Sequence, residues 1–148
     1  MKKNFYPKKD KTYFNNKINK KEYFKLIFNY LDNKKSKLDI LDVGCASGDF
    51  LYLFSKDKKF VLSGIDFSRD LLKIARKKVP NAKFKICDLR KKITLKKKFD
   101  ICTCLGTLSI FDNIFVIINN LINLVKKGGE LIFFEPINVH DVNVLVRY

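Results

Sequence analysis

Short apolar runs and amphipathic segments alternate along the chain. The apolar runs are rich in branched and aromatic residues and are about eight residues long, which is typical of strands buried within a sheet. The amphipathic segments repeat apolar residues every three or four positions, which predicts helices. The predicted strands are 37–44, 60–67, 82–89, 99–106 and 130–136, and the predicted helices are 20–31, 47–56, 69–79 and 113–127.

This alternation predicts an α/β fold: a doubly wound, mainly parallel sheet with helices on both faces. Ser68 is placed to cap the helix 69–79, and the Pro80–Asn81 pair is placed to close it. The third strand alternates apolar residues with lysines and therefore resembles an edge strand. The link 90–98 is barely long enough for a crossover between parallel strands.

The length of 148 residues favours one domain with a real hydrophobic core. We expect a flexible basic arm at 1–19 and a folded domain at 20–148. No apolar run is long enough for a membrane span or suited to a signal peptide, so we expect no membrane span and a cytoplasmic location. No metal site is expected, because the cysteines form no CxxC pair and fall in strand-like segments, as buried free thiols do. These cysteines are Cys45, Cys87, Cys102 and Cys104.

A formal net charge of +16 raises the possibility of a nucleic-acid partner, because a basic surface attracts phosphate. However, only four of the 31 basic residues are arginine, the residue best suited to base readout and bidentate phosphate binding. The abundance of Lys, Asn, Ile and Phe is also what an AT-rich genome imposes on any protein. A solvated lysine surface is therefore favoured over a nucleic-acid face, which stays as the alternative.

The most informative stretch is LDILDVGCASGDF, in which three small residues, Gly44, Ala46 and Gly48, follow a predicted strand. In an open parallel sheet, ligands lie beyond the carboxyl ends of the strands, where backbone N–H groups at the start of a helix can approach them. Side chains in this loop would hold a ligand away. A second acid, Asp66, ends the next strand 24 residues after Asp42 and suits the hydroxyl groups of a ribose.

A dinucleotide fingerprint would need a third glycine at position 49, which is Asp49 here. The actual spacing, D-x-G-x-A-x-G from Asp42 to Gly48, resembles the first motif of class I methyltransferases, (D/E)-x-G-x-G-x-G. These enzymes use S-adenosyl-L-methionine. The glycine pair in KKGGELIFFEP is similar to the family's turn into its fifth strand, so the resemblance extends over about 38–136.

The resemblance implies a role for each matching residue. Asp42 and the loop 44–48 would lie against the methionine group, Asp66 would hold the ribose hydroxyls, and Asp88 would accept from the adenine amine. Phe67 would flank the adenine. The full set of expected cofactor-binding residues is Asp42, Gly44, Cys45, Ala46, Gly48, Asp66, Phe67, Asp88, Leu89, Leu105 and Gly106, of which the last two would line the path to the methyl group.

The stretch CLGTLSIFDN, residues 104–113, has no (D/N)-P-P-(Y/F) motif of nucleic-acid amino-methylases. It resembles small-molecule methyltransferases, which implies methyl transfer to a small molecule or sugar, on an oxygen. A hydroxyl nucleophile benefits from a general base, and His140 with Asp141 are the expected catalytic residues, Glu135 being a further candidate. An RNA methyltransferase is the alternative enzyme.

The sheet of this family usually has seven strands, and the predicted strands here number five. The resemblance therefore implies that the last two strands are missing and that the domain is incomplete at its C-terminus. The fifth strand would expose an edge, so we expect a partner or a second copy to cover it. The chain could then be a cofactor-binding fragment that does not turn over on its own.

Overall fold

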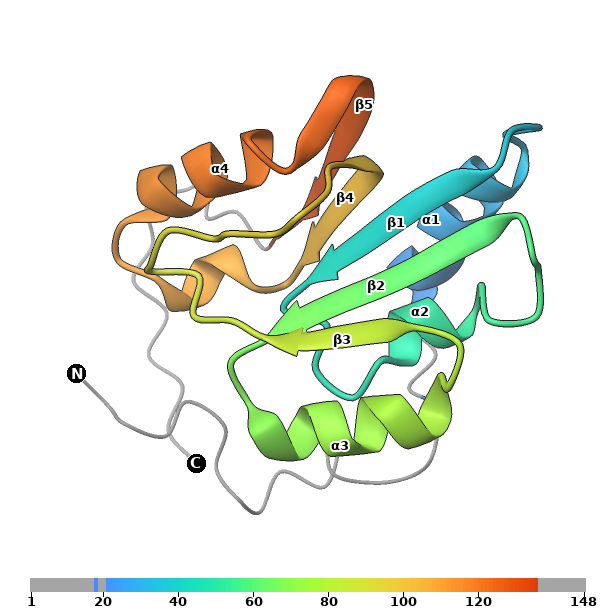
Figure 1. Cartoon of the computed structure of the whole chain (residues 1–148), viewed down its shortest axis with the longest axis horizontal. Helices are drawn as coiled ribbons and strands as arrows, with labels where there is room; N and C mark the ends of the chain where they lie inside the picture. Colours follow the sequence, from blue (N-terminus) through green and yellow to red (C-terminus); the bar gives the residue numbers. More distant parts are fainter. Residues whose placement is uncertain (1–17, 19–20, 136–148) are drawn as a thin grey trace.

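A five-stranded parallel sheet with the strand order β3-β2-β1-β4-β5 organises the chain (Figure 1). The computed structural model describes residue 18 and residues 21–135. Its strands are β1 (Leu38–Val43), β2 (Phe60–Asp66), β3 (Lys83–Ile86), β4 (Phe99–Leu105) and β5 (Val125–Phe134). Its helices are α1 (Glu22–Asp32), α2 (Asp49–Tyr52), α3 (Arg69–Lys78) and α4 (Ile114–Ile122), with a 3₁₀ helix η1 (Leu108–Ile110). The predicted α/β fold with a parallel sheet is confirmed.

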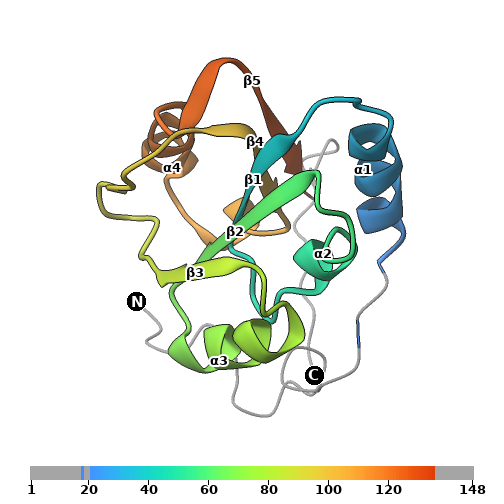
Figure 2. The ribbon, with the colours of Figure 1, turned by 45° about the vertical axis from the view of Figure 1, so that its right-hand side comes forward.

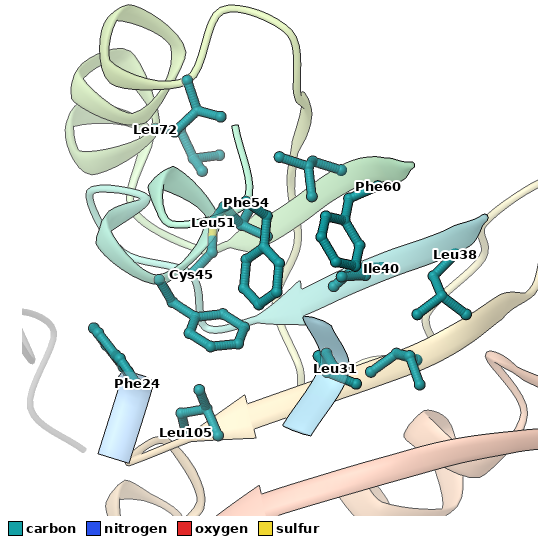
Figure 3. Close-up of a cluster of buried hydrophobic side chains, with 14 residues drawn as sticks. Phe24, Leu31, Leu38, Ile40, Cys45, Leu51, Phe54, Phe60, Leu72 and Leu105 are labelled. Carbon is teal, nitrogen blue, oxygen red and sulfur yellow. The ribbon is translucent and has the colours of Figure 1, made fainter. Parts of the chain in front are cut away.

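One face of the sheet is covered by α1, α2 and α3, whose apolar side chains form a core with β1 and β2 (Figure 3). Ile40 and Phe60 point into this core from the strands. Leu31 and Leu72 reach it from α1 and α3, and the Phe54 ring packs edge-on against Phe60 with ring centroids 4.9 Å apart. The packing of helix on strand explains why the strands are apolar on this face.

The opposite face of the sheet packs against α4. Leu41 and Val43 alternate along β1 with the residues of the first core, as successive side chains of a strand must. They meet Ile117 and Leu121 of α4, together with Cys104 of β4. Figures 1 and 2 show α4 on the other side of the sheet from α1 and α2. The helices therefore lie on both faces, as the sequence predicts.

The junction between α4 and β5 differs from the prediction of a helix over 113–127. Helix α4 ends at Ile122, and β5 begins at Val125, before the glycine pair. A bulge makes this possible: Phe99 pairs with Val125, but Ile101 pairs with Glu130. The two glycines lie within this bulge, where an irregular backbone is needed. Sequence periodicity continues the helix through 123–127 because these residues are compatible with either structure.

Helix α2 is also shorter than predicted, covering Asp49–Tyr52 rather than 47–56. Gly48 at its N-cap has a left-handed backbone (φ +79°), so the helix cannot start earlier. The predicted cap of α3 is confirmed, because the Ser68 hydroxyl accepts from the Leu71 N–H at 3.3 Å. β3 lies at an edge of the sheet, also as predicted.

Within the described residues, no helix is long and apolar enough to cross a membrane. All four cysteines are free thiols, three of them buried and Cys87 partly buried. The predicted arm 1–19 and the residues after Glu135 fall almost entirely outside the described part of the chain.

Candidate functional site

The loops that follow β1 and β4 line one pocket at the carboxyl edge of the sheet, where the strand order reverses. The residue before α1 closes a third side. A ligand site at this switch point is what an open parallel sheet favours. The pocket is lined by Lys21, Phe24, Asp42, Gly44, Cys45, Ala46, Asp49, Phe50, Leu105, Gly106 and Thr107.

The loop after β1 has an unusual backbone. Gly44, Ala46 and Gly48 all adopt positive φ angles, of +73°, +45° and +79°. Ala46 is the one non-glycine residue with positive φ in the described part of the chain. Its strain is offset locally, because its N–H donates to the Asp66 carboxylate at 2.9 Å. The sequence motif therefore corresponds to a loop that is held in one shape by the next strand.

Asp66 lies at the tip of β2 and is 2% exposed. Its Oδ2 accepts from Ala46 and its Oδ1 from the Ser68 N–H at 2.8 Å. Burial raises the pKa of this carboxyl, while the N–H groups of Ser68, Ala46 and Phe67 oppose the rise. A carboxylate can accept about four hydrogen bonds, so Asp66 organises two loops and keeps capacity for a further donor.

Asp42 lies at the end of β1, lines the pocket and is 3% exposed. The Thr103 hydroxyl of β4 donates to its Oδ1 at 2.8 Å. Burial raises the pKa of Asp42 to about 7, the Thr103 hydrogen bond opposes this rise, and the nearby Asp66 adds to it. Lys21 also acts to lower the pKa of Asp42. The site therefore contains a buried acid that would gain from a cationic group in the pocket.

The residues predicted to meet an adenine lie beyond this pocket. Both oxygens of Asp88 accept from the Arg90 guanidinium, at 2.7 and 2.5 Å, and this pairing lowers the pKa of Asp88. Phe67 is 43% exposed beside the end of β2. Leu89 is buried in the core under α4, so its side chain does not line the pocket. Asp88 would have to exchange its arginine partner to accept from an adenine amine.

Leu105, the last residue of β4, and Gly106, which follows it, line the pocket, and their place on the path to the methyl group stays a prediction. Of the expected bases, His140 and Asp141 lie outside the described residues. The third candidate, Glu135, is engaged by backbone N–H groups of the loop after β4.

Several groups at the site were not predictable from sequence motifs. Lys21 and Thr107 line the pocket, and Thr103 holds Asp42. Asp49 forms a buried ion pair with Lys78 of α3, at 2.5 Å and with both side chains under 10% exposed. These residues belong to no spacing motif. Only Thr103, a polar residue between two cysteines of an apolar strand, could have indicated a buried hydrogen-bond partner.

Comparison with known proteins identifies the family. A family model described as a methyltransferase domain matches residues 34–144. A ubiquinone biosynthesis O-methyltransferase of Glaesserella parasuis is 33% identical over 121 residues, covering 74% of this chain and 50% of the relative. The chain spans about half the length, or less, of the curated relatives it matches first.

Solved structures give the same result for the fold. Streptomyces venezuelae DesVI superposes with a TM-score of 0.70 at 22% identity, covering 83% of this chain and 55% of that one. CalS10, an amino pentose methyltransferase of Micromonospora echinaspora solved with S-adenosylmethionine bound, has a TM-score of 0.68 at 22% identity, with coverage of 78% and 51%. The motif, the fold and the family match agree, and the chain belongs to the class I S-adenosylmethionine-dependent methyltransferase family.

Proposed function

We propose that this chain binds S-adenosyl-L-methionine at the carboxyl edge of its sheet and serves methyl transfer to an oxygen of a small molecule or sugar. The observation that carries the proposal is the pairing of a buried acid, Asp42, with a loop from Gly44 to Gly48 that contains only small residues, three of which adopt positive φ angles. A second buried acid, Asp66, ends the neighbouring strand.

The residues present fit the cofactor chemically. The α-ammonium of its methionine group would meet Asp42, and Lys21, which also lines the pocket, would meet the carboxylate. Asp66 would take a ribose hydroxyl with its remaining acceptor capacity. The bound cofactor supplies a methyl group activated by its sulfonium, so the protein's main contribution is positioning and exclusion of water.

The class of acceptor is supported by the relatives. The ubiquinone O-methyltransferase methylates oxygen by its name, and CalS10 is an amino pentose methyltransferase. The loop after β4 carries none of the nucleic-acid methylase motifs. A small-molecule or sugar hydroxyl is therefore the proposed acceptor, and His140 and Asp141 are the proposed source of the base.

We further propose a cytoplasmic location and a partner or second copy along β5. The location is supported by the lack of a helix, within the described range, that could cross a membrane. Among the described strands β5 has a neighbour on one side only, and Phe133 and Phe134 are 38% and 46% exposed on it. An exposed apolar edge strand favours pairing.

Binding of S-adenosylhomocysteine tests the proposal directly. Replacing Asp66 with alanine is expected to weaken this binding about tenfold to a hundredfold, because a charged acceptor for a ribose hydroxyl is lost. Isothermal titration calorimetry measures it. Asp70→Ala is the matched control, since Asp70 lies in the first turn of α3, is exposed, and pairs with Lys73 one turn further along the helix. Wild-type chain that binds NAD but not S-adenosylhomocysteine would refute the proposal.

The pH dependence of binding tests the role of Asp42. Because the pKa of Asp42 in the folded chain is about 7, lowering the pH from 8 to 6 should protonate it and weaken S-adenosylhomocysteine binding, by up to about tenfold per pH unit below 7. Asp42→Asn should bind more weakly at pH 8 and lose this dependence. An equal slope in both proteins would show that another group titrates.

The folding stability of the ligand-free chain should respond to pH in the opposite sense to ligand binding. The pKa of Asp42 is raised on folding from 3.8 to about 7, so the folded chain binds more protons and loses stability as the pH rises through this window. Asp42→Asn removes that loss, and asparagine can still accept from Thr103. The ligand-free variant should therefore unfold at higher urea concentration than the wild type at pH 8.

A further inference from the structure

The carboxylate of Glu135, which follows β5, caps the 3₁₀ helix η1, which follows the neighbouring strand β4. Glu135 directly follows β5, and its Oε1 accepts from the N–H groups of Thr107 and Leu108 at 2.7 and 2.8 Å. Its Oε2 accepts from Ser109 at 3.3 Å. The first N–H groups of a helix have no partner within the helix, and Glu135 accepts from three N–H groups at the start of η1.

This arrangement frees the side chain at the N-cap position. Thr107 is the N-cap of η1, yet its hydroxyl makes no capping hydrogen bond. Instead the side chain packs against the glycine loop: a Cβ added to Gly44 would lie 2.2 Å from Thr107 Oγ1. A hydrogen bond from Thr107 also acts on the Cys104 thiol. Glu135 therefore fixes the backbone of Thr107, and the Thr107 side chain fixes the spacing to Gly44.

The backbone next to Thr107 is tied to the same strand end. The Gly106 N–H donates to the Phe134 carbonyl at 2.7 Å, so four consecutive N–H groups from Gly106 onward are held by the end of β5. Gly106, Thr107 and Gly44 all line the pocket, and the Thr107 side chain lies against Gly44. The distance between the two pocket walls thus depends on the last residues of β5.

We propose that Glu135 is a positioning residue that holds the loop after β4 at the correct distance from the glycine loop for the methionine end of the cofactor. The proposal rests on the proposed function, since it assumes that S-adenosylmethionine occupies this pocket. It assigns Glu135 a role different from that of a catalytic base, because both carboxylate oxygens face backbone N–H groups.

The test compares two ligands that differ in the methionine group. Glu135→Ala should weaken S-adenosylhomocysteine binding by about tenfold or more, because charged hydrogen bonds to three N–H groups are lost. Binding of 5′-methylthioadenosine, which lacks the amino-acid part, should stay within about twofold of wild type. General destabilisation of the domain would weaken both ligands alike. Hydrogen exchange of the Thr107, Leu108 and Ser109 amides should accelerate in the variant.

Glu135→Gln is the second variant and keeps the proposal testable if the alanine protein does not fold. Its amide oxygen can still accept from Thr107 and Leu108, but its NH₂ group faces the Ser109 N–H, so we expect an intermediate loss of S-adenosylhomocysteine affinity. Glu130→Gln is the matched control on the same strand, because Glu130 accepts from Tyr30 and Lys34 away from the pocket. It should bind both ligands as the wild type does.

Two results would overturn the positioning role: wild-type affinity for S-adenosylhomocysteine in a folded Glu135 variant, or an equal loss of affinity for both ligands. Failure of the proposed function looks different. In that case the wild-type chain itself binds neither ligand.

Discussion

Replacing Gly44 with alanine is expected to lower the free energy of unfolding by about 2–5 kcal/mol and to abolish measurable cofactor binding. Two costs add. The backbone at Gly44 has φ +73°, a left-handed conformation that costs a residue with a Cβ about 1–2 kcal/mol. The new Cβ would also lie 2.2 Å from Thr107 Oγ1 and 2.7 Å from its Cγ2, so the two pocket loops must separate.

The chain contains a matched control for the first of these costs. Gly128 has φ +79°, but a Cβ added there would meet nothing within 4 Å. Gly128→Ala should therefore show only the backbone cost in urea denaturation, and the difference from Gly44→Ala isolates the steric clash. Adding Thr107→Ala to Gly44→Ala should restore part of the stability. Equal destabilisation by the two glycine variants would disprove the tight contact between the loops.

Replacing Lys78 with methionine is expected to destabilise the chain by about 3–5 kcal/mol at neutral pH. The Lys78 and Asp49 side chains are 6% and 8% exposed, and the variant would leave the Asp49 carboxylate buried without its cation, with the Ser47 hydroxyl donating to it at 2.9 Å. Breaking a buried pair costs far more than the pair contributes, because the remaining charge loses its compensation. Denaturant unfolding measures the change.

The same helix supplies the control for this experiment. Lys73 pairs with Asp70 across one turn of α3, but both side chains are largely exposed, so Lys73→Met should cost about 0.5 kcal/mol or less. Replacing both members of the buried pair, in Asp49→Asn with Lys78→Met, should recover most of the lost stability. A single Lys78→Met variant as stable as Lys73→Met would contradict the buried ion pair.

The strands were predictable because burial on both faces leaves a nearly continuous apolar run, and β1, β2 and β4 lie within the predicted limits. The end of α4 was not predictable from periodicity. Residues 123–127 are apolar and basic in a pattern that suits a helix, and the pairing of β5 with β4 decides the outcome through a bulge. Tertiary hydrogen bonding overrides local preference there.

Some features of the candidate site were likewise predictable from the sequence, and others were not. The glycine loop, Asp42 and Asp66 were recognisable because their chemistry needs fixed residue types at fixed spacing. The role of Glu135 was not, because its partners lie 26 to 28 residues earlier and are backbone N–H groups, which every residue but proline possesses. The position of Asp88 after the third strand was predictable from the sequence. Its pairing with Arg90 was not, because that pairing depends on side-chain geometry.

The parallel sheet also has a consequence for synthesis of the chain. Strand β1 is central, and its partner on one side is β4: Ile40 pairs with Ile101, 61 positions later. No hairpin can form between neighbouring strands of a parallel sheet, so every pairing waits for a crossover. While the ribosome makes the residues between them, one edge of β1 has unpaired backbone N–H and C=O groups and is open to wrong partners. We therefore expect the nascent first half of the domain to be prone to wrong pairing until β4 emerges.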